Sequence, residues 1–533
     1  MTIPWLTILA LLPAVGAVVL IFTGAKAAKQ VALVVSLITF GFALMIATRF
    51  TIGGGMQLVE QVPWIKPLGA YYALGLDGLG LTLVLLVVII TPVVIIASWR
   101  DFDPVDAGPE SIEGLQASPT APTPSTSSAT LAAKYDARVF FALLLAVQTC
   151  ALYLFLATDV FLFYVFFEVI LVPMYFLIGG FGPGPRRTYA AAKFLIFGLL
   201  GGFVMLASVI GLYVLSARAG APSYLLSTLS QLDIATGTGR WLFLGFMFAF
   251  AIKAPLVPLH TWLPDAAEES TAGGATMMVG VMDKIGTFGM IRFCLGLFPE
   301  ASQWATPVVL VLATISILYG AILAIGSRDI MRFIAYTSIS HFGFIVLGIF
   351  AFTSQSLTGS TLYMLNHGMA TAALFVMAGY LIKRRGSRDM NAYGGVDRVA
   401  PVLAGLLLFA GLNTLSLPGL GSFVSEFMVL AGTFGRHPAY AVISTLAIVL
   451  AALYILIMYQ RTMTGPVDPE VQEKVTEING RERLAMVPLV LLIFLLGVFP
   501  KPLLSVIEPT TQATLQHVGV TDPQPRVTAE GGR

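Results

Sequence analysis

The sequence predicts an all-α polytopic membrane protein with about fourteen transmembrane helices, and three observations support this class. Of the 533 residues, 57% are hydrophobic and only 11% are charged, whereas a soluble domain is about 25% charged. Long apolar segments recur along the chain, at the roughly 20 residues that a helix needs to cross a bilayer. The formal net charge is only +2, which is too small to indicate a nucleic-acid-binding surface.

Fourteen segments have the length and composition of membrane spans. The twelfth is too long for one simple crossing and contains a break. In order, the segments are 4–23, 31–49, 79–98, 137–157, 158–178, 188–216, 241–262, 271–298, 304–326, 329–352, 359–383, 397–434, 438–464 and 484–500.

Positive charge predicts how these spans are oriented. Most lysines and arginines outside the spans lie in loops that follow odd-numbered spans, and such loops are retained in the cytoplasm. Both termini are therefore expected on the non-cytoplasmic side. Lys193 and Arg292 lie inside spans six and eight, and we expect their long side chains to reach towards the membrane surface.

The segment 101–136 differs from the rest of the chain. It contains "ASPTAPTPSTSSA" at 117–129, which is rich in Pro, Ser and Thr. Such a composition buries too little apolar surface to fold. A disordered cytoplasmic loop is therefore expected, and a docking segment is the alternative.

The predicted spans fall into blocks along the chain. Residues 1–100 hold the first three spans, and 465–533 would hold a cytoplasmic loop, the last span and a C-terminal tail. Spans four to eight fill 137–298, and spans nine to thirteen fill 304–464. Because each of these blocks has an odd number of spans, the second enters the membrane from the opposite face. This is the arrangement of two inverted five-helix repeats.

The fourth span of each block is interrupted. The interruptions are "FAIKAPLVPLHTWLPDA" (250–266) and "NTLSLPGLGSFVSEF" (413–427). Because proline has no N–H, Pro255 should leave the carbonyl of Ala251 without its helical partner. Unpaired backbone groups at membrane depth are tolerated only against protein or water, so the sequence predicts two hydrated breaks. Prolines that are merely common in membrane helices are the alternative.

Four ionisable residues lie deep in the predicted spans. Glu168, Lys253 and Lys284 are near the middle of spans five, seven and eight, and Glu426 is in the second half of span twelve. A charge at such depth costs roughly 2.5–3.5 kcal/mol and typically marks an ion path. A carboxylate beside Lys253 would hold the proton of the lysine, and Glu168 is the expected partner. A released proton would pass to Lys284 and then Glu426; a purely structural ion pair is the alternative.

Three of the five histidines lie near the breaks or at membrane depth, namely His260, His341 and His367. Imidazole both gives and accepts a proton near neutral pH. These residues are therefore candidate relays, although a single histidine of this kind often only packs in the core.

Motifs for other chemistries are missing from the sequence. It contains no phosphate-binding loop and no dinucleotide fingerprint. Cys150 and Cys294 lie in apolar stretches and provide neither a metal-ligand pair nor a disulfide framework. We therefore expect no metal, cofactor or redox centre in this chain, and an energy source in a partner subunit or another ion gradient.

Four motifs together resemble one known family. "KAPLVPLHTWLPDA", "AYTSISHFGF", "NHGMATAALF" and "LPGLGSFVSEF" occur in this order, as in the antiporter-like membrane subunits of respiratory complex I, the NADH-quinone oxidoreductase. Carried over by motif, the proton path of the family comprises Glu168, Lys253, Lys284, His341, His367 and Glu426. One departure is "AEESTAGG" after "HTWLPDA", where the family commonly has a histidine and an "EAP" pattern.

The resemblance implies a function and partners. The chain would translocate protons in the membrane arm of a bacterial plasma-membrane NADH:quinone oxidoreductase. FMN, iron–sulfur clusters and quinone would belong to partner subunits, and antiporter-like subunits L and N would flank this chain in the lipid bilayer. A subunit of a multisubunit cation/proton antiporter and a structural scaffold are the alternatives.

Overall fold

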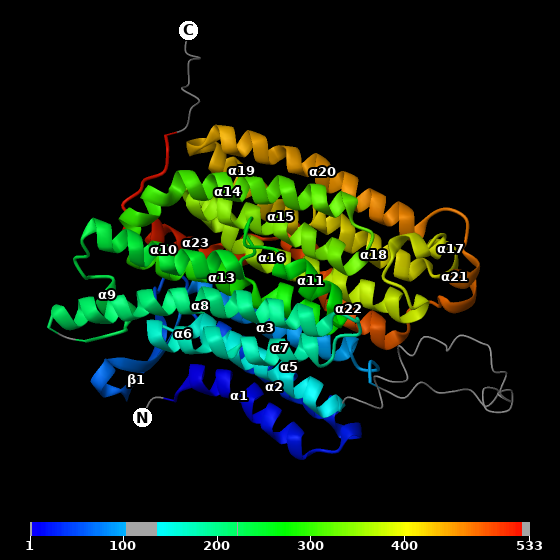
Figure 1. The fold of residues 1–533 in the computed structure, drawn as a ribbon, viewed down its shortest axis with the longest axis horizontal. Coiled ribbons are helices and arrows are strands. Elements are labelled where there is room, and N and C mark those ends of the chain that lie inside the picture. Colours follow the sequence, from blue (N-terminus) through cyan, green and yellow to red (C-terminus); the bar gives the residue numbers. More distant parts are fainter. Residues whose placement is uncertain (1–2, 103–135, 221, 525–533) are drawn as a thin grey trace, which may run out of the picture.

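The computed structural model describes residues 3–102, 136–220 and 222–524, and this part of the chain is a bundle of long helices (Figure 1). Within it, ten helices are long and apolar enough to cross a membrane, or eleven if one bent pair counts as a span. The ten are α1 (Trp5–Phe22), α2 (Ala25–Arg49), α3 (Gly78–Ala97), α5 (Ala137–Leu156), α6 with α7 (Val160–Val169, Leu171–Gly179), α8 (Arg187–Arg218), α14 (Pro299–Gly326), α15 (Ile330–Phe350), α16 (Ser354–Arg385) and α20 (Pro438–Met463).

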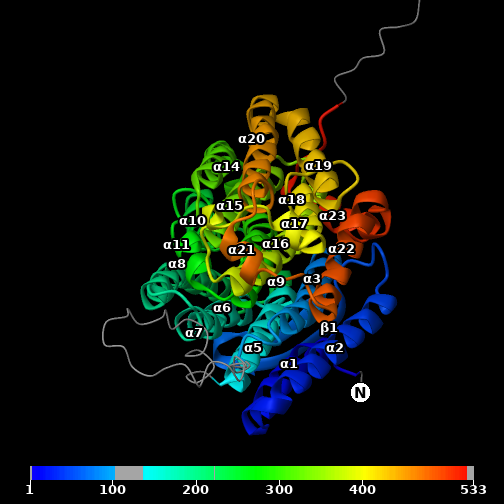
Figure 2. The ribbon, with the colours of Figure 1, turned by 90° about the vertical axis from the view of Figure 1, so that its right-hand side faces the viewer.

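The centre of the bundle is formed by α15 and α16. In the apolar 18-residue stretch of each helix, 94% of the residues of α15 and 89% of those of α16 are buried. The corresponding shares are 33% for α1 and 28% for α2. In two views, α1 and α2 lie at one end of the bundle and α19 and α20 at the other (Figure 1, Figure 2). Polar groups on α15 and α16 therefore face protein rather than lipid.

The first predicted break is present. Helix α10 (Thr236–Lys253) ends at the lysine, and the chain resumes as α11 (Trp262–Glu269). The expectation of an unpaired Ala251 carbonyl is wrong, because the chain turns and the N–H of Leu256 donates to this oxygen at 3.0 Å. The indole of Trp262 likewise donates to the carbonyl of Ile252, at 2.9 Å.

The second break separates α18 (Pro401–Thr414) from α19 (Gly421–Arg436). The chain turns there with positive φ angles of 60° at Ser416 and 95° at Gly419. Asn413 Oδ1 accepts from the N–H of Ser422 at 3.2 Å, and Asn366 of α16 donates to the carbonyl of Gly421 at 2.6 Å. At both breaks, protein groups thus form hydrogen bonds with some of the backbone groups that have no helical partner. The predicted water within the breaks stays a prediction.

The predicted span 271–298 is not a regular α-helix. Two short α-helices, α12 (Ala272–Met277) and α13 (Lys284–Gly289), alternate with π-helical stretches at Met278–Met282 and Met290–Leu295. A π-helical stretch widens the turn and is frequent at functional sites. Because its hydrogen bonds span five residues, it changes the direction in which the following side chains point.

A two-stranded antiparallel hairpin corrects the purely α-helical prediction. Strands β1 (Gln57–Ile65) and β2 (Ala70–Leu76) are joined by a 3₁₀ turn at Lys66–Leu68. The carboxylate of Glu60 in β1 accepts from the N–H groups of Leu6 and Thr7, at 2.7 and 3.0 Å. The hairpin therefore satisfies part of the free N-terminal backbone of α1, as a capping residue does.

The remaining elements are short or lie near the C-terminal end. Helices α22 (Gly480–Val498) and α23 (Lys501–Val518) meet at 71°, so part of the predicted tail is helical. The short elements are α9 (Leu226–Leu229), α17 (Val396–Val399), α21 (Pro469–Lys474) and a 3₁₀ turn at Met390–Ala392.

The all-α membrane class is confirmed apart from the hairpin, and all fourteen predicted ranges contain helix. The number of fourteen crossings, the inverted repeats and the block boundaries stay predictions. The proposed disordered loop at 101–136 falls almost wholly on residues 103–135, which lie outside the described residues.

Candidate functional site

Lys253 is the last residue of α10 and is buried beside two phenylalanine rings. Its side chain is 2% exposed, and its Nζ has no hydrogen-bond partner among the described residues. The rings of Phe167 and Phe194 lie 4.8 and 5.8 Å from Nζ. A cation over an aromatic face is stabilised in part by the ring quadrupole, so the site accommodates a charge without a direct ion pair.

Glu168 comes from α6 and lies close to Lys253 without binding it. The two side chains interact electrostatically, while the Oε1 atom of Glu168 accepts no hydrogen bond from the described part of the chain. Gly202 of α8 makes room for this carboxylate, because a Cβ there would lie 1.5 Å from Oε1. The expected partners are therefore neighbours, but not a closed ion pair.

Lys284, at the start of α13, makes the central contact of the site. Its Nζ donates to the carbonyl of Val279 at 2.6 Å and lies 2.7 Å from Nδ1 of His367 in α16. Both side chains are 0% exposed. The ring of Phe342 lies 5.1 Å from the same Nζ.

The series of contacts continues from His367 to His341 of α15. The two imidazole rings are 5.3 Å apart and nearly perpendicular. Nε2 of His341 lies 3.5 Å from the hydroxyl of Tyr454 in α20. His367, His341 and Tyr454 thus follow Lys284, each near the one before, and each can hold or pass a proton.

Glu426, in α19, lies at the second break and is 5% exposed. Its Oε2 accepts from the hydroxyl of Tyr363 at 2.9 Å and from that of Ser416 at 2.5 Å. The ring of Tyr363 is 5.9 Å from that of His341. This tyrosine therefore connects the histidine pair to the glutamate.

Sequence reasoning missed Tyr363, Tyr454 and Ser416. Tyr363 is four residues before His367 on one helix, and this spacing places both on the same face. That spacing was the available signal. Nothing in the local sequence distinguishes Tyr454 from the other tyrosines of the spans.

His260 lies in the first break, apart from the other two histidines. It is 5% exposed, and its ring meets the edge of Tyr319 of α14 at 5.4 Å. Its Nδ1 has no hydrogen-bond partner in the ranges that the structure describes. The structure thus brings Lys284, His367, His341 and Glu426 into one series of contacts, and leaves His260 outside it.

Lys193 belongs to an ion-pair cluster at one end of the bundle. Its Nζ lies 2.7 Å from Asp265 of α11. The guanidinium of Arg332 in α15 also pairs with Asp265, and with Glu268 at 2.7 Å. The expectation that Lys193 reaches towards the membrane surface stays a prediction, and the structure adds that its charge is paired within the protein.

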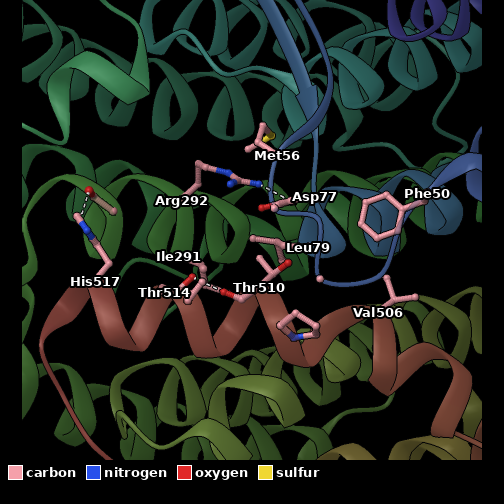
Figure 3. A pocket seen from close by; sticks show the side chains of 15 residues that line it. Phe50, Met56, Asp77, Leu79, Ile291, Arg292, Val506, Thr510, Thr514 and His517 are labelled. Carbon is pink, nitrogen blue, oxygen red and sulfur yellow. Dashed lines mark hydrogen bonds and ion pairs between the residues drawn. The ribbon is translucent and has the colours of Figure 1, made fainter.

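Arg292 is likewise paired rather than free. Its Nη2 lies 2.7 Å from Asp77, which also caps α3 by accepting from the N–H of Gly80 at 2.8 Å. This pair lines a cavity of about 320 Å³ beside α23, and Figure 3 shows Thr510 and Thr514 of α23 on the opposite wall.

Comparison with known proteins places this arrangement in a family. The family model described as NADH:quinone oxidoreductase/Mrp antiporter, TM matches residues 157–453, which include both breaks and all seven site residues predicted from the sequence. The chain belongs to this family of antiporter-like transmembrane subunits.

Individual relatives narrow the assignment. NADH-quinone oxidoreductase subunit M of Mycobacterium tuberculosis (strain H37Rv) is 48% identical, and the match covers 98% of this chain and 96% of the relative. Subunit M of Escherichia coli K12 is 34% identical, with 95% and 96% covered. Within the family, the chain belongs with the subunit M proteins of NADH-quinone oxidoreductase, which confirms the resemblance of its motifs.

Solved structures share the fold. A chain of respiratory complex I from Thermus thermophilus with bound NADH superposes with a TM-score of 0.84 at 30% identity, covering 97% of this chain and all of that one. A chain of the Mrp complex from Dietzia sp. DQ12-45-1b gives 0.80 at 20% identity, covering 97% of this chain and 100% of that chain. The second likeness is one of fold alone.

Proposed function

We propose that this chain translocates protons as a membrane-arm subunit of NADH:quinone oxidoreductase. The ionisable groups of its path would be Glu168, Lys253, Lys284 and Glu426, with His260, His341 and His367 as relays. The observation that supports this most is the series of contacts from Lys284 through the two histidines to the glutamate. Buried polar groups are expensive unless they are partnered, and here the partners themselves exchange protons.

Energy for the transport would come from partner subunits. Moving one charge against 100 mV costs about 2.3 kcal/mol, and redox chemistry at FMN, iron–sulfur clusters and quinone in those subunits would supply it. Subunits L and N would flank the chain, both termini would face the non-cytoplasmic side of the bacterial plasma membrane, and 137–298 and 304–464 would be inverted repeats.

Lys253→Ala tests the proposal in the assembled complex. We expect NADH-driven proton pumping into membrane vesicles to be lost, because the first half of the path would have no group that exchanges a proton with Glu168. The matched control is Lys501→Ala, which removes an exposed lysine at the start of α23. An assembled Lys253→Ala complex that pumps protons at the wild-type rate would contradict the proposal.

Copurification separates the alternative of a cation/proton antiporter subunit. The proposal expects flavin- and iron–sulfur-binding polypeptides to remain bound after mild detergent extraction. Recovery of the chain with small membrane subunits only, and cation/proton exchange without NADH, would favour the antiporter.

A further inference from the structure

Asp283 is a buried carboxylate that lies outside the series of contacts described above. It is 0% exposed, and neither of its carboxylate oxygens accepts a hydrogen bond from residues 3–102, 136–220 or 222–524. It stands directly before Lys284, where the first π-helical stretch ends and α13 begins. An ionisable group left without a partner at this depth costs more than an apolar residue would.

The helix face that Asp283 shares with Gly286 of α13 packs against the end of α10. Gly286, three residues later, is so close to α10 that a Cβ would lie 2.6 Å from the nitrogen of Ala254 and 2.7 Å from the carbonyl of Phe250. Positions three apart share a helix face. Asp283 is therefore on the side of α13 that faces the segment carrying Lys253.

The next residue points to a different helix. Lys284 contacts His367 of α16, and Thr287 on the same face donates to the sulfur of Met364, also of α16, at 3.2 Å. Successive residues of a helix are rotated by about 100°. Asp283 thus faces α10 and Lys284 faces α16, although the two residues are adjacent in the chain.

Electrostatics agree with this geometry. Asp283 interacts with the charges of both Lys253 and Lys284. The structure describes no hydrogen bond between the two lysines, whereas the carboxylate has both of them as charged neighbours. Asp283 is therefore a titratable group with a charged neighbour both in the first half of the path and at its centre.

We propose that Asp283 carries protons between Lys253 and Lys284, an inference that rests on the proton-translocating function proposed above. The ammonium of Lys253 gives a proton to the carboxylate, which leaves a neutral amine and a carboxylic acid. The acid then gives the proton to the neutral amine of Lys284, which restores the carboxylate and forms an ammonium. Each step breaks one N–H or O–H bond and forms another, and it needs no other reactant.

Asp283→Asn in the whole complex tests the inference, because the amide keeps the shape but holds no transferable proton. We expect proton pumping at least about tenfold slower than in the wild type, since a positioned proton-transfer group typically contributes about 10²–10⁴-fold. Asp283→Glu should restore pumping. Thr314→Val is the control: it is also isosteric and removes a buried hydroxyl without a partner in the described structure, and it should pump normally.

Each outcome decides the inference. An assembled Asp283→Asn complex that pumps like the wild type, beside a Lys253→Ala complex that does not, overturns the role of Asp283 alone. Full pumping by both variants overturns the proposed function. If Asp283→Asn does not assemble, infrared difference spectra during turnover decide: a protonated carboxyl band that shifts in Asp283→Glu supports the inference, and an unshifted spectrum overturns it.

Discussion

Gly202→Ala tests the position of the Glu168 carboxylate without changing any charge. The added Cβ would lie 1.5 Å from Oε1 and 2.5 Å from the carboxyl carbon. To reach ordinary van der Waals contact, which begins at 3.4 Å, the carboxylate must move by about 2 Å. The substitution therefore displaces the proposed partner of Lys253 while every titratable group of the path remains.

The size of the effect follows from this displacement. A misplacement of about 1 Å costs a reaction roughly 10²-fold in rate, so we expect the rate of NADH-driven proton pumping to fall at least about tenfold. Overpacking of a core costs about 1–3 kcal/mol of stability, and the complex should still assemble. Pumping is followed with a pH-sensitive dye in vesicles, and assembly by the NADH oxidation that artificial electron acceptors support.

Two further variants complete this test. Gly405→Ala in α18 is the control, because a Cβ there meets no atom within 4 Å and should leave pumping unchanged. The double variant Gly202→Ala with Glu168→Asp should recover pumping, because the shorter aspartate side chain leaves room for the added methyl group. Wild-type pumping by Gly202→Ala alone would refute the reasoning, as would a double variant that pumps as slowly as Gly202→Ala.

Two other substitutions test one contact in the path and one ion-pair cluster outside it. Tyr363→Phe removes the donor to Glu426, which we expect to cost about 1–3 kcal/mol and to slow pumping; an unchanged thermal midpoint together with an unchanged pumping rate would contradict a role for this hydroxyl. Asp265→Asn leaves Lys193 and Arg332 with one partner fewer, so the unfolding temperature in detergent should fall. The expected loss is about 1–3 kcal/mol, below the roughly 3–5 of a fully buried pair, because the two basic side chains are 20% and 29% exposed. Asp389→Asn, at an exposed turn, is the control, and an equal midpoint in both variants would count against the cluster.

Burial of the charged residues within the bundle was predictable from the sequence, whereas direction around each helix was not. The apolar runs located the spans, and the charges within them located Lys284 and Glu426 at buried positions. Whether two such groups touch depends on how each helix is rotated about its own axis and on where the helices are broken. Glu168 and Lys253 therefore proved to be neighbours without a direct bond, and Asp283 lies directly after a π-helical stretch that the sequence did not predict.

Ion pairs between residues far apart in the chain were the second feature that the sequence did not predict. Arg292 pairs with Asp77, and Lys193 with Asp265, but no local pattern connects either pair. The hairpin at 57–76 was missed for a related reason, because its cross-strand pairing and its cap on α1 are tertiary contacts. The motifs, by contrast, indicated the family directly, since they are short stretches of sequence and two of the four contain the breaks.

The two halves of the site differ in how their polar groups are satisfied. Lys284 and Glu426 each have at least one hydrogen-bond partner, whereas the Nζ of Lys253 and both oxygens of Asp283 have none in the described structure. Because an unpartnered buried charge costs far more than a neutral group, the free energy of the first half depends strongly on which of these groups holds a proton. Transfer of a proton from Lys253 to a carboxylate neutralises both at once. A change in protonation is therefore expected to alter side-chain positions in the first half more than around Glu426.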